Sequence, residues 1–121
     1  MNVRLKWLES ANPQRLAISA IGALLSAHQS IGVPQPLLLF GTEEQKKKYL
    51  PRVARKEISA FALTETNAGS DPANMSLRAD PTEDGSAFIM NGEKLWCTNG
   101  TLAELLVVMA RDPKTKKISA F

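Results

Sequence analysis

The sequence predicts an α+β protein in which N-terminal helices precede an antiparallel β domain. Residues 14–30 are apolar on nearly every face of a helix, and residues 42–45 begin a second helix. After Glu57 the pattern changes to short apolar runs separated by turn signals, which is typical of β-strands. We therefore expect two units, a helical segment over residues 1–56 and a β domain over residues 57–121.

The first helix has clear start and stop signals. Asn12 can cap free amides and Pro13 suits the first helical position. Gly32 and Pro34 then end the apolar pattern. We expect a helix from residue 14 to about residue 30, packed on several sides.

The second helix begins with a capping box, in which Thr42 and Gln45 bond each other's backbone amides. Acidic residues follow at 43 and 44, and basic residues lie at 52, 55 and 56, as the helix dipole favours. Pro51 interrupts this run, which predicts a kink or break near Leu50.

The β domain is read from alternating apolar runs and turns. The expected strands cover residues 58–63, 77–79, 87–90, 94–98 and 105–110. Asp84-Gly85 and Asn91-Gly92 are hairpin-type turns on either side of the third strand. The run 105–110 is apolar throughout, so we expect it to be buried on both faces or shared between sheets. Residues 118–121 read as the opening of a strand with no partner, which predicts a truncated β domain and a fragment of a longer protein.

Composition narrows the class of protein. The 121 residues allow one modest core, and the net charge is +3. Five of the 15 basic residues lie in two lysine runs without interleaved aromatic residues, which indicates a solvated face rather than a nucleic-acid surface. One cysteine and one histidine, far apart, predict no disulfide and no metal site. There is no secretory pattern and no apolar run near ~20 residues, and the single cysteine fits a reducing compartment.

Residues 61–71 combine a buried strand end with a polar turn that suits a flat cofactor with a phosphate tail. The backbone and the Thr64 hydroxyl can bond a ring edge. Gly69 has no Cβ, so the main chain can approach a ligand, and Ser70 offers a hydroxyl and an amide to a phosphate oxygen. The alternative is an ordinary loop capped by Asp71.

Residues 91–100 hold a second candidate group. On a strand, Trp96 and Thr98 share a face, so the indole can stack on a ring while the hydroxyl bonds a ring nitrogen. The alternative is a core tryptophan beside a threonine.

Three blocks, residues 37–51, 61–71 and 91–100, occur in the order and at the separations of the acyl-CoA dehydrogenase family, which the chain resembles from about residue 21 to residue 121. The lysine-rich end and the 105–110 run are most similar to the very-long-chain subgroup. Two positions depart from the family pattern: Thr66 stands where proline is common, and Asn74 where a small residue is usual.

The resemblance implies a helical N-terminal domain, a β middle domain and a C-terminal four-helix domain. It implies that the whole enzyme uses FAD to oxidise an acyl-CoA thioester to the trans-2-enoyl-CoA, as in fatty-acid β-oxidation. Electron-transfer flavoprotein would be the electron acceptor and the enzyme would be a homo-oligomer.

The same resemblance implies a set of cofactor contacts within this chain. Phe61, Leu63 and Thr64 would meet the flavin ring edge, and Gly69 and Ser70 the pyrophosphate. Ser70 would also help to seat the thioester substrate. Trp96 would cover the ring, and Cys97 and Thr98 would lie beside it, with Thr98 near N5.

No catalytic residue is assigned within residues 1–121. The family's glutamate base lies in the C-terminal helical domain, and the position of Glu65 in the cofactor turn suits a structural role. Two other readings remain open. One is an acyl-CoA oxidase or nitroalkane-oxidase relative, and the other is a non-catalytic interaction module that retains the β domain.

Overall fold

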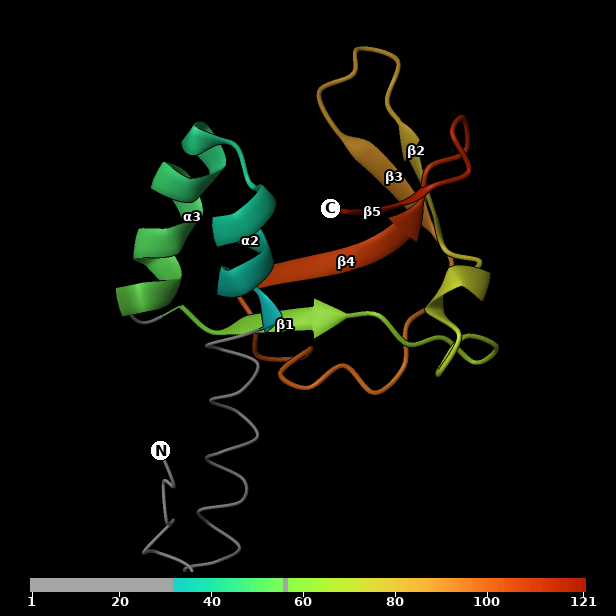
Figure 1. Ribbon diagram of the computed structural model, residues 1–121, viewed down its shortest axis with the longest axis horizontal. Helices are drawn as coiled ribbons and strands as arrows, with labels where there is room; N and C mark the ends of the chain where they lie inside the picture. The colour runs from blue at the N-terminus through green and yellow to red at the C-terminus, as the bar shows by residue number, and fades with distance from the viewer. Residues whose placement is uncertain (1–31, 56) are drawn as a thin grey trace, which may run out of the picture.

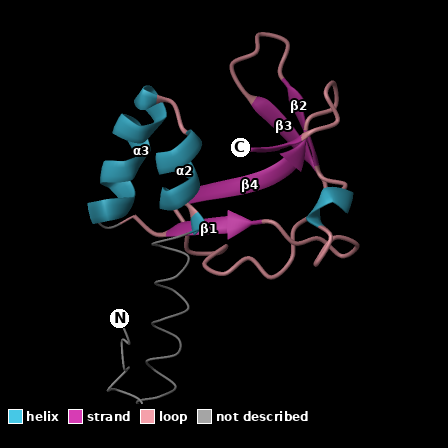
Figure 2. Ribbon diagram, in the orientation of Figure 1, coloured by secondary structure: helices cyan, strands magenta, loops and turns pink. Residues whose placement is uncertain are grey.

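The computed structural model describes residues 32–55 and 57–121. In this part of the chain two α-helices precede a five-stranded sheet, which confirms the α+β class (Figures 1 and 2). The helix expected over residues 14–30, with its start signal at Asn12, lies outside the described residues.

The helices α2 (Pro34–Phe40) and α3 (Glu43–Arg55) lie side by side. The capping box is confirmed: the Gln45 amide donates to Thr42 Oγ1 at 3.2 Å, and the Thr42 amide donates to Gln45 Oε1 at 2.9 Å. Of the kink or break predicted near Leu50, the break is wrong, because α3 continues through Pro51 to Arg55. Pro51 and Lys47 are both exposed, so water can satisfy the Lys47 carbonyl that loses its helical donor.

The sheet is mixed, which corrects the antiparallel sheet expected from the sequence. Strand β1 (Ser59–Ala62) pairs in parallel with β4 (Leu105–Arg111), with Ser59 opposite Leu105. Parallel pairing needs a long connection, and the hairpin of β2 (Arg78–Pro81) and β3 (Phe88–Asn91) and the loop after it lie between these strands in the chain. The β2–β3 pair is antiparallel, and β5 (Ile118–Ala120) pairs antiparallel with β4.

Strand β4 joins the two parts of the sheet. Its Arg111 amide donates to the Leu77 carbonyl next to β2, while Val108 exchanges two hydrogen bonds of 2.9 Å with Phe121 beside β5. The strand expected to end without a partner therefore has one. Most residues of β4 are half-buried, and Leu106 is exposed. Within the described residues, β4 is therefore not buried on both faces.

The two predicted hairpin turns have different outcomes. Asp84-Gly85 forms the β2–β3 turn, with Gly85 at φ +69° and Asp84 accepting from Thr82 and Ser86. Asn91-Gly92 is not a hairpin turn. Gly92 has φ +140°, and a Cβ there would lie 2.8 Å from the Cα of Leu77, so the backbone passes Leu77, just before β2, too closely for any side chain.

A small core lies where the strands meet. Leu77, Ala79 and Ala110 are buried, and Val108 and Phe121 pack against them. The ring of Phe121 also meets Phe88 edge to face, with ring centroids 4.7 Å apart. Neither described helix is long and apolar enough to cross a membrane.

Candidate functional site

The two polar segments singled out in the sequence lie alongside each other. Residues 93–95 run antiparallel to residues 64–66, joined by three successive contacts. Thr66 Oγ1 donates to Glu93 Oε1 at 2.9 Å, Lys94 Nζ contacts Glu65 Oε1 at 2.8 Å, and the Leu95 amide donates to the Thr64 carbonyl at 2.8 Å. Thr66 thus provides a hydroxyl bridge that a proline could not.

The predicted strand over residues 94–98 is wrong, because this segment forms no backbone ladder with β1. Side chains of this segment contact the backbone carbonyls at the edge of β1 instead. Cys97 Sγ lies 3.6 Å from the Phe61 carbonyl, and Asn99 Nδ2 donates to the Ser59 carbonyl at 3.2 Å. In Figure 1 the connection from β3 to β4 runs along β1 on the side away from β4.

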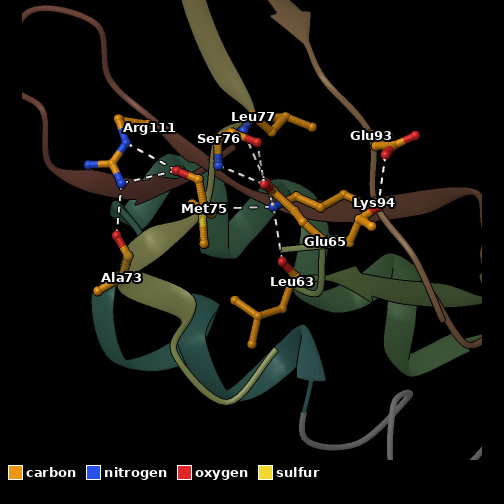
Figure 3. A network of polar contacts seen from close by, with 10 residues as sticks. Leu63, Glu65, Ala73, Met75, Ser76, Leu77, Glu93, Lys94 and Arg111 are labelled. Atoms are coloured by element: carbon orange, nitrogen blue, oxygen red, sulfur yellow. Dashed lines mark hydrogen bonds and ion pairs between the residues drawn. The ribbon is translucent and has the colours of Figure 1, made fainter. Parts of the chain in front are cut away.

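A buried ion pair connects the two segments at their centre. Glu65 and Lys94 have side chains that are only 2% and 8% exposed. Lys94 Nζ also donates to the Leu63 carbonyl at 3.0 Å, so one ammonium group binds acceptors on both sides of Thr64. Figure 3 shows this arrangement, with the Glu65 carboxylate and the Leu63 carbonyl both facing Lys94.

The Glu65 carboxylate is saturated with donors. It accepts from the Ser76 amide at 2.6 Å, the Ser76 hydroxyl at 2.8 Å and the Leu77 amide at 3.0 Å, besides Lys94. Burial would raise its pKa, but the hydrogen bonds from Lys94, Ser76 and Leu77 outweigh burial and lower the pKa to about 2. A carboxylate with so low a pKa and no free face is a poor general base, which supports a structural role for Glu65.

Arg111 holds the turn behind this pair. Its guanidinium donates to the carbonyls of Ala73 at 2.8 Å and Met75 at 3.0 Å (Figure 3), and to that of Lys116 at 2.8 Å. Met75 is buried, and its sulfur lies 3.8 Å from Lys94 Nζ. The backbone that supplies donors to Glu65 is therefore anchored to the end of β4.

Trp96 lies outside any strand, contrary to the expectation that it shares a strand face with Thr98. The residue is 87% exposed, and its backbone has φ +55°. An aromatic residue in the left-handed region is an outlier that costs free energy, and such outliers gather at functional sites. The adjacent Leu95–Thr64 hydrogen bond holds this indole near the end of β1. The alternative of a core tryptophan is excluded for the described part of the chain.

Three hydroxyls of the two segments, those of Thr64, Ser70 and Thr98, have no hydrogen-bond partner among the described residues. Gly69 is exposed, and a Cβ there would meet no atom within 4 Å. The protein itself therefore does not require glycine at this position, whereas a ligand lying against the backbone would. Free hydroxyls, an open glycine and an uncovered indole fit the donor and stacking needs of FAD.

The remaining predicted contacts line the same edge. Phe61 and Leu63 are half-buried, and their carbonyls accept from Cys97 and Lys94. Burial raises the pKa of the Cys97 thiol, so it is a packing group rather than a thiolate. No role for Lys94 or Asn99 was predicted from the sequence, because a lysine or an asparagine beside a turn ordinarily faces solvent. Within residues 32–55 and 57–121 no cluster of metal-ligating side chains forms.

Comparisons with known proteins identify the family and the fold. Residues 60–121 match the acyl-CoA dehydrogenase middle-domain model, and residues 14–57 match the N-terminal-domain model. A probable acyl-CoA dehydrogenase of Mycobacterium tuberculosis is 60% identical over 107 residues, 85% of this chain and 16% of that protein. The very long-chain specific acyl-CoA dehydrogenase of Homo sapiens mitochondria is 46% identical over 110 residues, 84% of this chain and 17% of that protein.

A solved structure shows the same fold. The acyl-CoA dehydrogenase of Bacillus anthracis, complexed with FAD, superposes with a TM-score of 0.78 at 37% identity, covering 84% of this chain and 17% of that chain. The chain spans about a sixth of the length of the curated relatives named above. Because the middle-domain model alone matches residues 60–121, more than half of the 121 residues, the chain belongs to the acyl-CoA dehydrogenase family.

Proposed function

We propose that this chain supplies part of the FAD seat of a longer acyl-CoA dehydrogenase, which oxidises an acyl-CoA thioester to the trans-2-enoyl-CoA. In this proposal residues 1–56 end a helical domain, and residues 57–121 form part of the β middle domain. The observation that carries the proposal is Trp96, whose exposed indole is held in a strained backbone beside Thr64.

Each free group then has a role. The Thr64 hydroxyl and the strand end at Phe61 and Leu63 meet the ring edge. Gly69 and Ser70 accommodate the pyrophosphate, with Ser70 also touching the thioester ligand. Trp96 covers the ring face, and Thr98, beside Cys97, donates to a ring nitrogen. The hydroxyls of Thr64, Ser70 and Thr98, which have no partner within the described chain, support these roles, as does the open space at Gly69.

The base that removes the substrate's α-proton must lie elsewhere in the protein. When bound, FAD supplies the acceptor for the hydride that leaves the substrate β-carbon. The α-proton needs a carboxylate base of suitable pKa, and the pKa of Glu65, about 2, makes that residue unsuitable. We place the base outside residues 1–121. We also propose electron-transfer flavoprotein as the acceptor, a homo-oligomeric enzyme, and a bacterial cytoplasmic or mitochondrial matrix location.

The proposal is tested on the full-length protein that carries this chain. An acyl-CoA thioester should reduce bound flavin and then an electron-accepting dye, with little oxygen consumed; rapid oxygen consumption would indicate an oxidase instead. Gly69→Val should fold normally, because no protein atom lies within 4 Å of a Cβ there, yet bind FAD more weakly. A wild-type protein that binds no FAD would refute the proposal, and unchanged affinity in Gly69→Val would remove this turn from the site.

A further inference from the structure

The Glu65–Lys94 pair is not required by the chemistry just proposed, yet it is the most buried ion pair among the described residues. Replacing a buried ion pair with well-packed neutral groups is often neutral or stabilising, so stability alone is weak grounds for its presence. Its position suggests another use. It lies between the residues that present Thr64 and those that present Trp96.

The contacts of Lys94 explain how it can set the geometry of both segments. Its ammonium donates to the Leu63 carbonyl at 3.0 Å and to Glu65 at 2.8 Å, which fixes the backbone on each side of Thr64. The next residue, Leu95, donates its amide to the Thr64 carbonyl at 2.8 Å. Two consecutive residues, Lys94 and Leu95, therefore fix the three consecutive residues 63–65 of the turn. Because Trp96 follows directly, they also fix the backbone from which the indole extends.

Glu65 fixes Lys94 in turn. Its carboxylate is held by the Ser76 and Leu77 amides, and these belong to the segment that Arg111 anchors to β4. One series of charged hydrogen bonds thus fixes the positions of the Thr64 hydroxyl and the Trp96 ring relative to the sheet. Charge-assisted hydrogen bonds of this kind are short and directional, which suits them to holding a site within the tolerance that binding needs.

We propose that Lys94, held by Glu65, is a positioning residue for the flavin: it sets the distance and angle between the Thr64 turn and the Trp96 indole. This inference rests on the proposed function, because it assumes that flavin occupies the space between these two groups. It assigns no contact between Lys94 and the flavin or the substrate.

The test uses the full-length protein with both charges removed, E65Q together with K94M, so that no unpaired charge remains buried. The thioether that K94M introduces cannot donate to the Leu63 carbonyl, so the two segments keep the Leu95–Thr64 hydrogen bond but lose the ammonium group that binds on both sides of Thr64. The matched control is Arg52→Met, which removes another ion pair, the 2.8 Å contact between Arg52 of α3 and Glu57 just after that helix. Apo-protein stability, the FAD dissociation constant and the fluorescence of bound flavin at saturating FAD are measured for each.

The double variant should bind FAD at least about tenfold more weakly than wild type, the effect of losing one charged hydrogen bond. Its bound flavin should also fluoresce more strongly, since an indole that no longer stacks no longer quenches. The Arg52→Met protein should keep wild-type affinity and fluorescence. Wild-type values for both flavin readouts in the double variant would overturn the inference while leaving the proposed function intact. A wild-type protein without bound FAD would instead refute the proposed function on which the inference rests.

Discussion

Lys94→Met alone should destabilise the full-length protein by about 3–5 kcal/mol, the usual cost of leaving a buried charge without its partner. The Glu65 side chain is 2% exposed and would keep only Ser76 and Leu77 as donors. Chemical denaturation of apo-protein measures the change. The E65Q and K94M combination should recover part of the loss, because no charge then stays buried, but the glutamine NH2 group faces a backbone donor of Ser76 or Leu77. A single variant as stable as wild type would show that the pair is open to water.

The same pair predicts how stability depends on pH. The pKa of Glu65 is lowered in the folded protein from 4.5 to about 2, so its contribution is complete above about pH 4.5 and is lost as pH falls toward 2. The double variant lacks this carboxylate. Its stability should therefore fall less steeply than that of wild type between about pH 5 and pH 2, which acid titrations of the two proteins can compare.

Trp96→Gly should weaken FAD binding and raise stability at the same time. Stacking of an aromatic side chain on a flat base is worth about 1–3 kcal/mol, which corresponds to roughly 5- to 150-fold in the dissociation constant. Glycine accepts the φ of +55° without the penalty that a side chain incurs there, so the apo-protein should gain about 1 kcal/mol. Isothermal titration with FAD and thermal unfolding measure the two effects.

Phe40→Ala is the matched control for this prediction. Phe40 is also an exposed aromatic residue, at 85%, but it lies at the end of α2. Its replacement should leave FAD affinity unchanged. A Trp96→Gly protein with wild-type FAD affinity would show that the indole serves another purpose.

Local chemistry was enough to predict the elements whose causes are local. The capping box at Thr42, the turn at Asp84-Gly85 and the apolar strands β1 and β4 are each specified by neighbouring residues. The two segments of the candidate site were also recognisable from residues 61–71 and 91–100.

The features that the sequence did not predict depend on tertiary contacts. The period-two spacing of Trp96 and Thr98 indicates a strand, but the Cys97 and Asn99 side chains occupy the carbonyls of β1 that a strand would have used. The parallel pairing of β1 with β4 depends on a connection too long for local patterns to specify. The burial of Lys94 follows from a carboxylate 29 positions earlier in the chain, which no local signal reveals.

The central claim, that the 61–70 turn and the 94–98 segment together hold FAD, is tested most directly by hydrogen–deuterium exchange. The full-length protein is compared with and without saturating FAD. Amides of both segments should exchange more slowly with FAD bound, because the cofactor covers and stiffens the backbone that carries the contacting groups. Strands distant from the site, such as β5, should change much less. Bound FAD with unchanged exchange in both segments would contradict the account.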